Sequence, residues 1–271
     1  MHAGWIESPR GPLFACHHPA RGARQRDVAV LLCDPFGSDR MNLHLTYRAL
    51  ALELAASGFP ALRVDYAGTG DSAGYPRDPD QVRGWLESLD AAADWLLRAS
   101  GRDVLGCFGA LLGGTLAAVF AERRADVRSL ALWGAHASGA AFLRELRAFS
   151  ALRSELAAAP RPPGWQDGDQ EGIGFLLTRE TVASIGALAI DPSRCRSVRR
   201  AALFARGPGR SEAALAAAFE RAGIDVAPPP QAVVDVAELE DERVRPPEAL
   251  VAQLAGWWRD AHPAAPRPAR A

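Results

Sequence analysis

The sequence has 271 residues, of which 48% are hydrophobic and 23% are charged. This is enough apolar material for one large core, and an α/β domain of this length need not be divided. The formal net charge of −1 provides no overall field that would attract nucleic acid or an anionic membrane. All 31 Lys-plus-Arg positions are Arg, which excludes Schiff-base chemistry and a P-loop lysine.

The four cysteines, Cys16, Cys33, Cys107 and Cys195, are scattered, with no CxxC pair and no neighbouring His at metal-ligand spacing. We therefore expect free thiols, no metal and no cofactor. The N-terminal residues lack the basic and apolar regions of a signal peptide. No stretch approaches the roughly 18 uninterrupted apolar residues of a membrane span. We expect a cytoplasmic protein with no nucleic-acid or membrane partner.

Strand and helix signals alternate along the first half of the chain. In chain order they predict a hairpin of Gly4–Glu7 and Leu13–Cys16, a strand over 28–33, a helix over 43–57, a strand over 61–64, a helix over 79–99, a strand over 103–108, a helix over 112–122 and a strand over 127–133. Such alternation is typical of βαβ units and a mostly parallel sheet.

The alternation breaks after the strand over 127–133. Helical spacing over 140–158 and 178–188 brackets a Pro-rich and polar stretch, so we predict a cap insertion over 138–197. A strand over 201–205, a helix over 211–222, a weak strand near 232–236 and a helix over 247–259 then follow. We expect one domain over 1–262 and a disordered tail over 263–271.

Three segments carry sequence patterns of known loops. Arg63–Gly74 reads as a strand that runs into a Gly-rich turn, without the G-x-G-x-x-G spacing of a dinucleotide site. Val104–Ala117 reads as a strand, a sharp turn and a helix, with small residues at the turn. Asp34–Asn42 follows the first buried strand.

Together with Phe142–Leu146, these segments resemble the α/β-hydrolase superfamily, and in particular its exosortase-associated and biosynthetic-cluster members. The resemblance implies an α/β-hydrolase fold, with a mostly parallel central sheet flanked by helices and a helical cap insertion. It makes Pro35, Phe36 and Gly37 part of the oxyanion loop at the pocket. It also matches Gly109-Ala-Leu-Leu-Gly113 to the nucleophile elbow, G-x-S-x-G.

The same resemblance places the nucleophile position at Leu111, with Leu112 beside it. A leucine has no atom that can attack a carbonyl. The segment where the acid is expected, Arg206–Glu212, contains no Asp, and Glu242 stands nearest the histidine position. His262 lies beyond the last predicted helix. We therefore predict a degenerate triad.

Three other residues are candidates for moving a proton. His136 follows a strand at the carboxyl edge of the sheet, where ligands bind in α/β folds, but it also suits a structural loop position. His44 either faces the pocket or lies on a helix surface. Asp34 and Asp65 end strands at one edge, so they either share a proton or cap the following turns. Glu145 is expected on a solvated helix surface.

The leading hypothesis is a non-hydrolytic protein that binds an acyl-like small molecule or supports a partner enzyme in a biosynthetic pathway. An alternative is an enzyme of altered chemistry that catalyses cyclisation, elimination or isomerisation of a natural-product or polysaccharide intermediate. A second alternative is an esterase or thioesterase with a relocated nucleophile such as Cys107. We expect Leu111, Leu112, Phe36 and His136 to surround one mainly apolar cavity beneath the insertion.

Overall fold

The computed structural model describes residues 1–22, 25–154, 165–172, 175–206, 212–228 and 246–264. Its centre is an eight-stranded sheet. The strands of this sheet are β1 (His2–Ile6), β2 (Leu13–His18), β3 (Val28–Cys33), β4 (Ala61–Val64), β5 (Val104–Ala110), β6 (Val127–Trp133), β9 (Arg200–Phe204) and β10 (Asp225–Val226). Their spatial order is β1-β2-β4-β3-β5-β6-β9-β10. The sheet is parallel from β4 to β10, whereas β2 pairs antiparallel with both β1 and β4.

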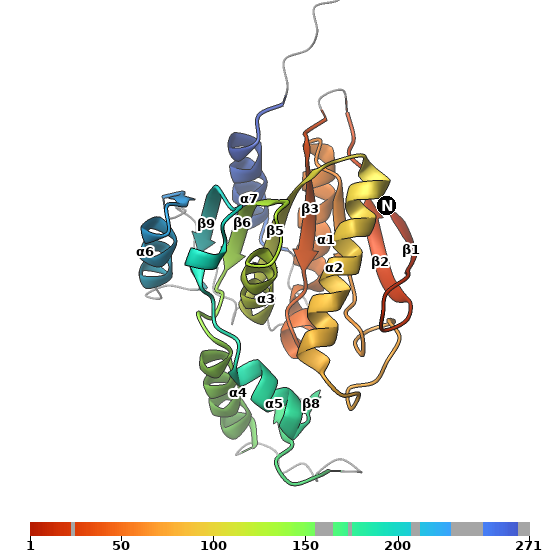
Figure 1. Ribbon diagram of the computed structural model, residues 1–271, viewed down its shortest axis with the longest axis vertical. Helices are drawn as coiled ribbons and strands as arrows, with labels where there is room; N and C mark the ends of the chain where they lie inside the picture. The colour runs from red at the N-terminus through yellow and green to blue at the C-terminus, as the bar shows by residue number, and fades with distance from the viewer. Residues whose placement is uncertain (23–24, 155–164, 173–174, 207–211, 229–245, 265–271) are drawn as a thin grey trace, which may run out of the picture.

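Helices cover both faces of this sheet (Figure 1). The helices α1 (Ser38–Ala56) and α7 (Glu248–Ala261) cover one face, and α2 (Gln81–Ser100), α3 (Leu111–Ala121) and α6 (Ala213–Arg221) cover the other. Along β3, Leu31 and Cys33 belong to the core beneath α2 and α3, whereas Val30 and Leu32 belong to the core beneath α1 and α7. Successive side chains of a strand point to opposite faces, so a strand covered on both sides needs a continuous apolar run.

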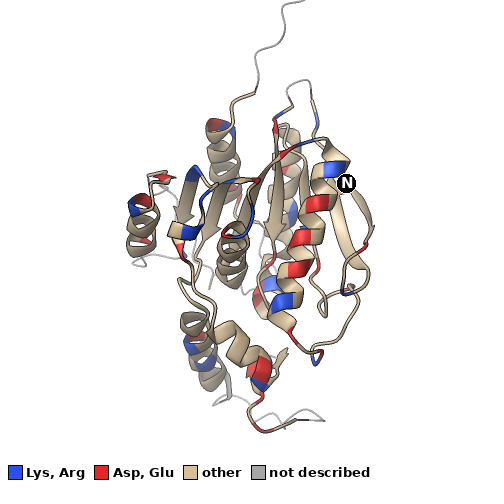
Figure 2. Cartoon of the chain, in the orientation of Figure 1, with Lys and Arg blue, Asp and Glu red and all other residues tan. Residues whose placement is uncertain are grey.

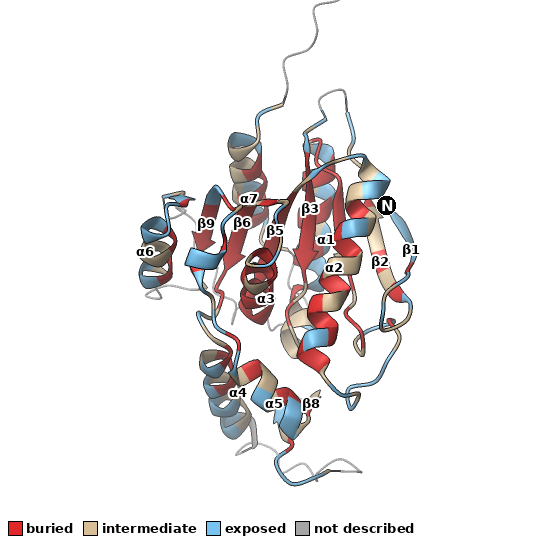
Figure 3. Cartoon of the chain, viewed as in Figure 1, coloured by how far each residue is buried: buried red, intermediate tan, exposed pale blue. Residues whose placement is uncertain are grey.

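Burial follows this layering. The central strands are buried along their length, and the outer faces of the helices are exposed (Figure 3). Charged side chains are concentrated on helix surfaces and loops rather than in the sheet (Figure 2). Among the helices that the structure describes, none is long and apolar enough to cross a bilayer.

The segment between β6 and β9 lies beyond the carboxyl ends of the strands, at the bottom of Figure 1. It contains α4 (Gly139–Ser154), β7 (Gln170–Gly172), β8 (Phe175–Leu177), α5 (Arg179–Gly186) and the 3₁₀ turn η1 (Pro192–Arg194). A single bridge between Ser138 and Ala189 closes its base. The sequence predicts both helices, but not the β7–β8 hairpin, whose strands are only three residues long. The strand predicted near 232–236 and most of the predicted tail lie outside the described residues.

A tight turn joins β5 to α3. Leu111, the first residue of α3, has a φ of 54°, and only one other described non-glycine residue, Asp80, has a positive φ. A left-handed conformation in a residue with a Cβ costs on the order of 1–3 kcal/mol. A buried network holds the turn: the N–H of Ala110 donates to the Tyr47 hydroxyl at 2.8 Å, and that hydroxyl donates to the carbonyl of Cys33 at 2.9 Å.

Glycines allow β3, β5 and α3 to approach each other at this turn. A Cβ on Gly109 would lie 2.3 Å from the carbonyl oxygen of Gly113, and one on Gly113 would lie 2.4 Å from that of Cys33. Both obstacles are backbone atoms, which cannot rotate away. The small residues in the sequence pattern are therefore required by packing.

We predict that Gly113→Ala lowers the free energy of unfolding by at least about 2 kcal/mol, because the added methyl group overlaps the backbone of β3. Gly256→Ala is the matched control: Gly256 lies on α7, and its added Cβ would meet its nearest neighbour at 3.7 Å. The control should be neutral or slightly stabilising, since Ala favours a helix over Gly by up to about 1 kcal/mol. Urea unfolding measures both variants, and equal stabilities would contradict this packing account.

Candidate functional site

The loop after β3 is short, and α1 begins at its end. Pro35 is buried, and Gly37 has a φ of 66°, a left-handed value that favours glycine. The prediction that the helix begins at Leu43 is wrong, because α1 starts at Ser38 and includes most of the expected loop. The turn at Gly37 lets the chain enter the helix five residues early.

A cavity of about 430 Å³ lies beside this loop. Its walls come from the loop after β3, the Gly-rich turn after β4, the start of α2, and β8 and α5 of the insertion. The lining side chains that matter most are Pro35, Phe36, Arg40, Met41, Tyr66, Trp85, Phe175 and Leu177. Phe36 is central to the aromatic wall, with ring centroids 5.4 Å from Trp85 and 6.0 Å from Phe175. The cavity therefore has an aromatic wall that extends from the loop after β3 to the insertion.

Most polar groups of this cavity already have partners. The Tyr66 hydroxyl donates to the carbonyl of Asp34 at 3.0 Å, and the Gln81 amide donates to the carbonyl of Tyr75 at 2.6 Å. Trp85 is the exception: it is 2% exposed, and its indole N–H has no hydrogen-bond partner among the described residues. The cavity thus presents an apolar surface with one free buried donor on a lining residue.

Arg40 joins Asp34 to Asp65. Its Nε donates to Asp34 Oδ2 at 3.3 Å, and its Nη2 donates to Asp65 Oδ1. Asp65 also accepts from the backbone N–H of Asp71 at 3.0 Å. The two carboxylates are therefore bridged by an arginine, and Asp65 also fits the expected role of capping the following turn. Burial raises the pKa of Asp34 to about 7, although the positive charge of Arg40 opposes this shift.

Asp34 and His44 line a second cavity, of about 550 Å³, on the other side of Arg40. His44 is exposed on α1, and its Nδ1 lies 2.5 Å from the carbonyl oxygen of Met41 in the preceding turn. This position matches the helix-surface interpretation of His44. Arg40 and Met41 line both cavities and separate them.

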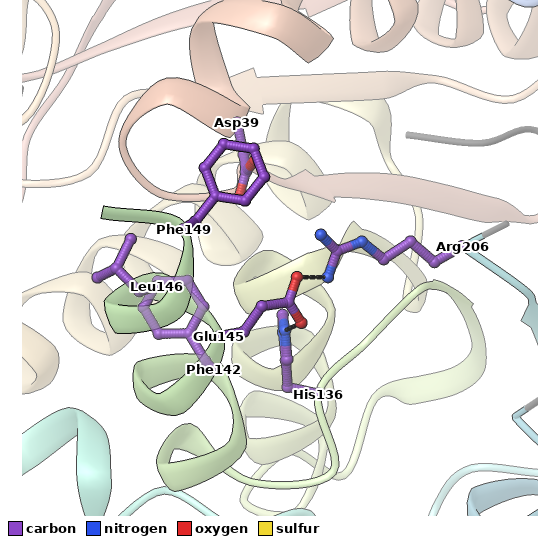
Figure 4. A pocket seen from close by; sticks show the side chains of 7 residues that line it. All are labelled: Asp39, His136, Phe142, Glu145, Leu146, Phe149 and Arg206. Carbon is purple, nitrogen blue, oxygen red and sulfur yellow. Dashed lines mark hydrogen bonds and ion pairs between the residues drawn. The ribbon is translucent and has the colours of Figure 1, made fainter. Parts of the chain in front are cut away.

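His136 belongs to a different group of side chains. Its Nε2 lies 3.2 Å from Glu145 Oε2, and Glu145 Oε1 is paired with Arg206 (Figure 4). The hydrogen bond from His136 and the charge of Arg206 lower the pKa of Glu145 to about 2. The expectation that Glu145 lies on a solvated helix surface is therefore wrong, because α4 turns this residue toward the sheet. Arg206 reaches Glu145 past Gly134, where a Cβ would lie 2.8 Å from the Arg206 side chain.

No protein-family model and no curated protein matches the chain. Several solved structures are similar over nearly the full length. Est1E from Butyrivibrio proteoclasticus, solved with bound ferulic acid, is 15% identical with a TM-score of 0.64, and the match covers 95% of this chain and 98% of Est1E. Proline iminopeptidase from Mycobacterium smegmatis is 16% identical with a TM-score of 0.61, over 96% of this chain and 98% of that enzyme.

A serine hydrolase without a lid from Xanthomonas campestris, XC6422, is 16% identical with a TM-score of 0.56, over 98% of this chain and 96% of that one. These likenesses decide the architecture. The chain has the α/β-hydrolase fold. The tip of the turn between β5 and α3 has a strained backbone. The residue there is Leu111.

Leu111 and Leu112 are both fully buried, and they enter opposite cores of the α/β-hydrolase fold. Leu111 packs in the core beneath α1 and α7, and Leu112 in the core beneath α2 and α3. Neither lines the cavity at Phe36 or the pocket at His136. The expectation of one cavity shared by Phe36, His136 and both leucines is therefore wrong. The leucine side chain fills the elbow, and the open space lies to either side.

Two other polar residues, Ser72 and His262, have structural positions. Ser72 donates to the carbonyl of Asp65 at 2.6 Å and accepts from the N–H of Phe14 at 2.9 Å, so it stabilises a turn. His262 ends α7 and stacks on Trp258, with Nε2 2.8 Å from Ser129 Oγ, so it is not part of the tail. Glu242 lies outside the described residues. Among those that are described, no group of three or more His, Cys, Asp or Glu side chains is arranged to hold a metal.

The raised pKa of Asp34 predicts a pH-dependent stability. A carboxyl whose folded pKa exceeds its unfolded value of about 4 stabilises the fold below that value, and the contribution is lost as pH rises toward 7. The wild-type protein should therefore lose roughly 2–4 kcal/mol relative to Asp34→Asn between pH 4 and pH 8. Urea unfolding of both proteins across this range measures the difference. A constant difference would mean that Asp34 titrates normally.

Proposed function

We propose that this chain is a non-hydrolytic protein that binds an acyl-like, mainly apolar small molecule. The observation that carries the proposal is Leu111, which has a φ of 54° at the turn where this fold places its nucleophile. The side chain is fully buried. Because leucine offers no oxygen or sulfur, no acyl-enzyme can form at this position.

Three of the four cysteines are poorly placed to replace the missing nucleophile, because they are buried. Cys33 and Cys107 are fully buried in neighbouring strands, and burial raises the pKa of the Cys33 thiol well above its usual value. Cys195 is also buried, and burial raises the pKa of its thiol to about 12. Since the thiolate is the reactive form, these environments oppose catalysis by cysteine. They disfavour the hypothesis of an esterase with a relocated thiol nucleophile.

The cavity at Phe36 suits an acyl-like ligand in size and chemistry. A volume of about 430 Å³ lies within the ordinary range of small-molecule sites. The rings of Phe36, Trp85 and Phe175 offer a surface for a flat apolar body. Est1E was solved with an aromatic acid, which makes an aryl-acyl compound a reasonable probe.

An enzyme of altered chemistry is the alternative that a specific observation favours. The pair His136 and Glu145 resembles the base and acid of a catalytic triad in its chemistry, although Glu145 comes from the insertion rather than from the end of β9. A supporting role beside a partner enzyme stays a prediction.

We predict that methyl cinnamate, the methyl ester of an arylacrylic acid without a ring hydroxyl group, binds to the protein and is not hydrolysed. Phe175→Ala should weaken binding about tenfold, because it removes an aromatic wall of the cavity. Calorimetric titration measures the affinities, and chromatography detects any cinnamate that is released.

The matched control is Phe149→Ala, which alters another partly buried aromatic residue of the insertion that lines the pocket at His136 instead. It should leave methyl cinnamate binding unchanged. Release of cinnamate by the wild-type protein would contradict the non-hydrolytic assignment. Failure of the wild-type protein to bind the ester would contradict the ligand-binding assignment.

A further inference from the structure

A cavity of about 330 Å³ lies at the edge of the sheet where the parallel strands begin, opposite the edge that holds the cavity at Phe36. One wall is the loop 122–126 between α3 and β6, and the other is the stretch 194–197 before β9. Arg128 of β6 joins the two walls, because its Nη1 donates to the carbonyl of Ala125 at 2.6 Å and to that of Ser197 at 3.4 Å. The two walls are therefore held at a fixed separation.

Arginine side chains dominate this cavity. Four of the seven residues that line it are arginines and only one is acidic: Glu122, Arg123, Arg124, Ala125, Arg194, Arg196 and Ser197. The side chains of Arg123 and Arg194 are 41% and 66% exposed, and Arg196 is also exposed, so a dissolved ligand reaches all three. Each guanidinium group carries five N–H donors and no acceptor. The lining therefore offers many more donors than acceptors.

Aspartates compensate part of this charge from outside the cavity. Asp90 pairs with both Arg123 and Arg124, and Arg124 is also paired with Asp94 at 2.8 Å and with Asp126 at 2.5 Å. None of these three aspartates is part of the lining. Arg124 is thus fixed in place by three carboxylates, whereas Arg123 has a single aspartate partner and keeps unused donors.

The one carboxylate of the lining presents little negative surface. The side chain of Glu122 is 3% exposed, its Oε1 accepts from the N–H of Asp191 at 2.9 Å, and its Oε2 lies 3.2 Å from Nη1 of Arg194. Arg194 has no other ionic partner among the described residues. The guanidinium group of Arg196 has neither a hydrogen-bond acceptor nor a carboxylate partner in the part of the chain that the structure describes. Accessible donors therefore converge on a space that lacks an accessible acceptor.

We propose that this cavity is a binding site for a diphosphate group, held between Arg123 and Arg124 on one wall and Arg194 and Arg196 on the other. A guanidinium group binds phosphate oxygens through two parallel hydrogen bonds, so paired arginines on facing walls suit an anion with two linked tetrahedral groups. The volume is about ten times the roughly 30 Å³ of a water molecule, which leaves room for both groups. The site does not depend on the function proposed for the cavity at Phe36.

The test is a calorimetric titration of the wild-type protein with inorganic diphosphate, at constant ionic strength and without divalent cations. We expect saturable binding of one diphosphate, at least about tenfold tighter than that of inorganic phosphate or of succinate, which has two charges but no tetrahedral group. Absence of saturable binding, or equal affinity for succinate, would overturn the proposal.

A free diphosphate and a diphosphate ester share this chemistry, and adenosine diphosphate separates the two sources. Tighter binding of adenosine diphosphate than of inorganic diphosphate identifies an ester as the ligand, and weaker binding identifies the free anion. Adenosine alone should not bind. If adenosine bound as tightly as its diphosphate, the phosphates would contribute nothing and the proposal would be wrong.

Variants locate the binding site. Arg196→Gln should weaken diphosphate binding at least about fivefold without lowering stability, because Arg196 has no protein partner to lose. The matched control is Arg199→Gln, which removes an equally exposed arginine close by in the chain that does not line the cavity. It should leave the affinity nearly unchanged, as should Phe175→Ala in the other cavity. Equal losses in Arg196→Gln and Arg199→Gln would indicate a general attraction of anions to exposed arginines, and this result would contradict a defined site.

Discussion

The close approach of β3, β5 and α3 at the turn after β5 determines the arrangement of everything around it. Gly109 and Gly113 leave no room for a Cβ, and Tyr47 ties Ala110 to the end of β3 by two buried hydrogen bonds. This frame forces Leu111 into a left-handed conformation, and the surrounding packing maintains it. The turn therefore has a strained backbone, and a buried hydrocarbon side chain stands at its tip.

The leucine changes what the turn contributes to the molecule. A serine at this position would require polar partners, because a buried hydroxyl without a hydrogen bond is destabilising. Leu111 instead packs into the core beneath α1 and α7, where burial of a leucine side chain contributes roughly 1.5–3 kcal/mol. The strain of the turn is offset locally by burial. The aromatic cavity at Phe36 and the pocket at His136 are separate spaces, and α1 and the insertion contribute residues to both.

Charged and titratable side chains form two clusters near this turn. Arg40 holds Asp34 and Asp65 together between two cavities, and Arg206 with Glu145 holds His136 beneath the insertion. In both clusters an arginine compensates the charge of a half-buried carboxylate, which would otherwise be costly to remove from water. The insertion takes part in both regions, because it supplies Glu145 to the histidine and Phe175 to the aromatic wall. The two sites differ in character, since one is mainly apolar and the other is lined by charged side chains as well as aromatic ones.

The apolar pattern predicts the mostly parallel sheet and its helices, and the resemblance of the loop segments adds the α/β-hydrolase fold. The continuous apolar run Val28–Cys33 predicts a strand that is buried on both faces. The glycines around Leu111 predict the sharp turn between one strand and the helix that follows it. The side-chain clusters are different, because they join residues far apart in the chain. No local pattern indicates that Glu145 faces His136 rather than solvent, or that Arg40 reaches Asp65. The start of α1 was also predicted wrongly. Gly37 permits a turn directly before the helix, and the composition of Ser38–Asn42 does not indicate that the helix already begins there.

The most direct test of the account is labelling with a fluorophosphonate, which reacts with activated serines and is detected as added mass on the intact protein. We expect no adduct on the wild-type protein and none on Leu111→Ser, because no histidine among the described residues is positioned at the turn to activate the new hydroxyl. A stoichiometric adduct on the wild-type protein would show that a serine elsewhere is activated. An adduct that appears only with Leu111→Ser would show that a base is already in place, and that the protein is a hydrolase lacking only its nucleophile.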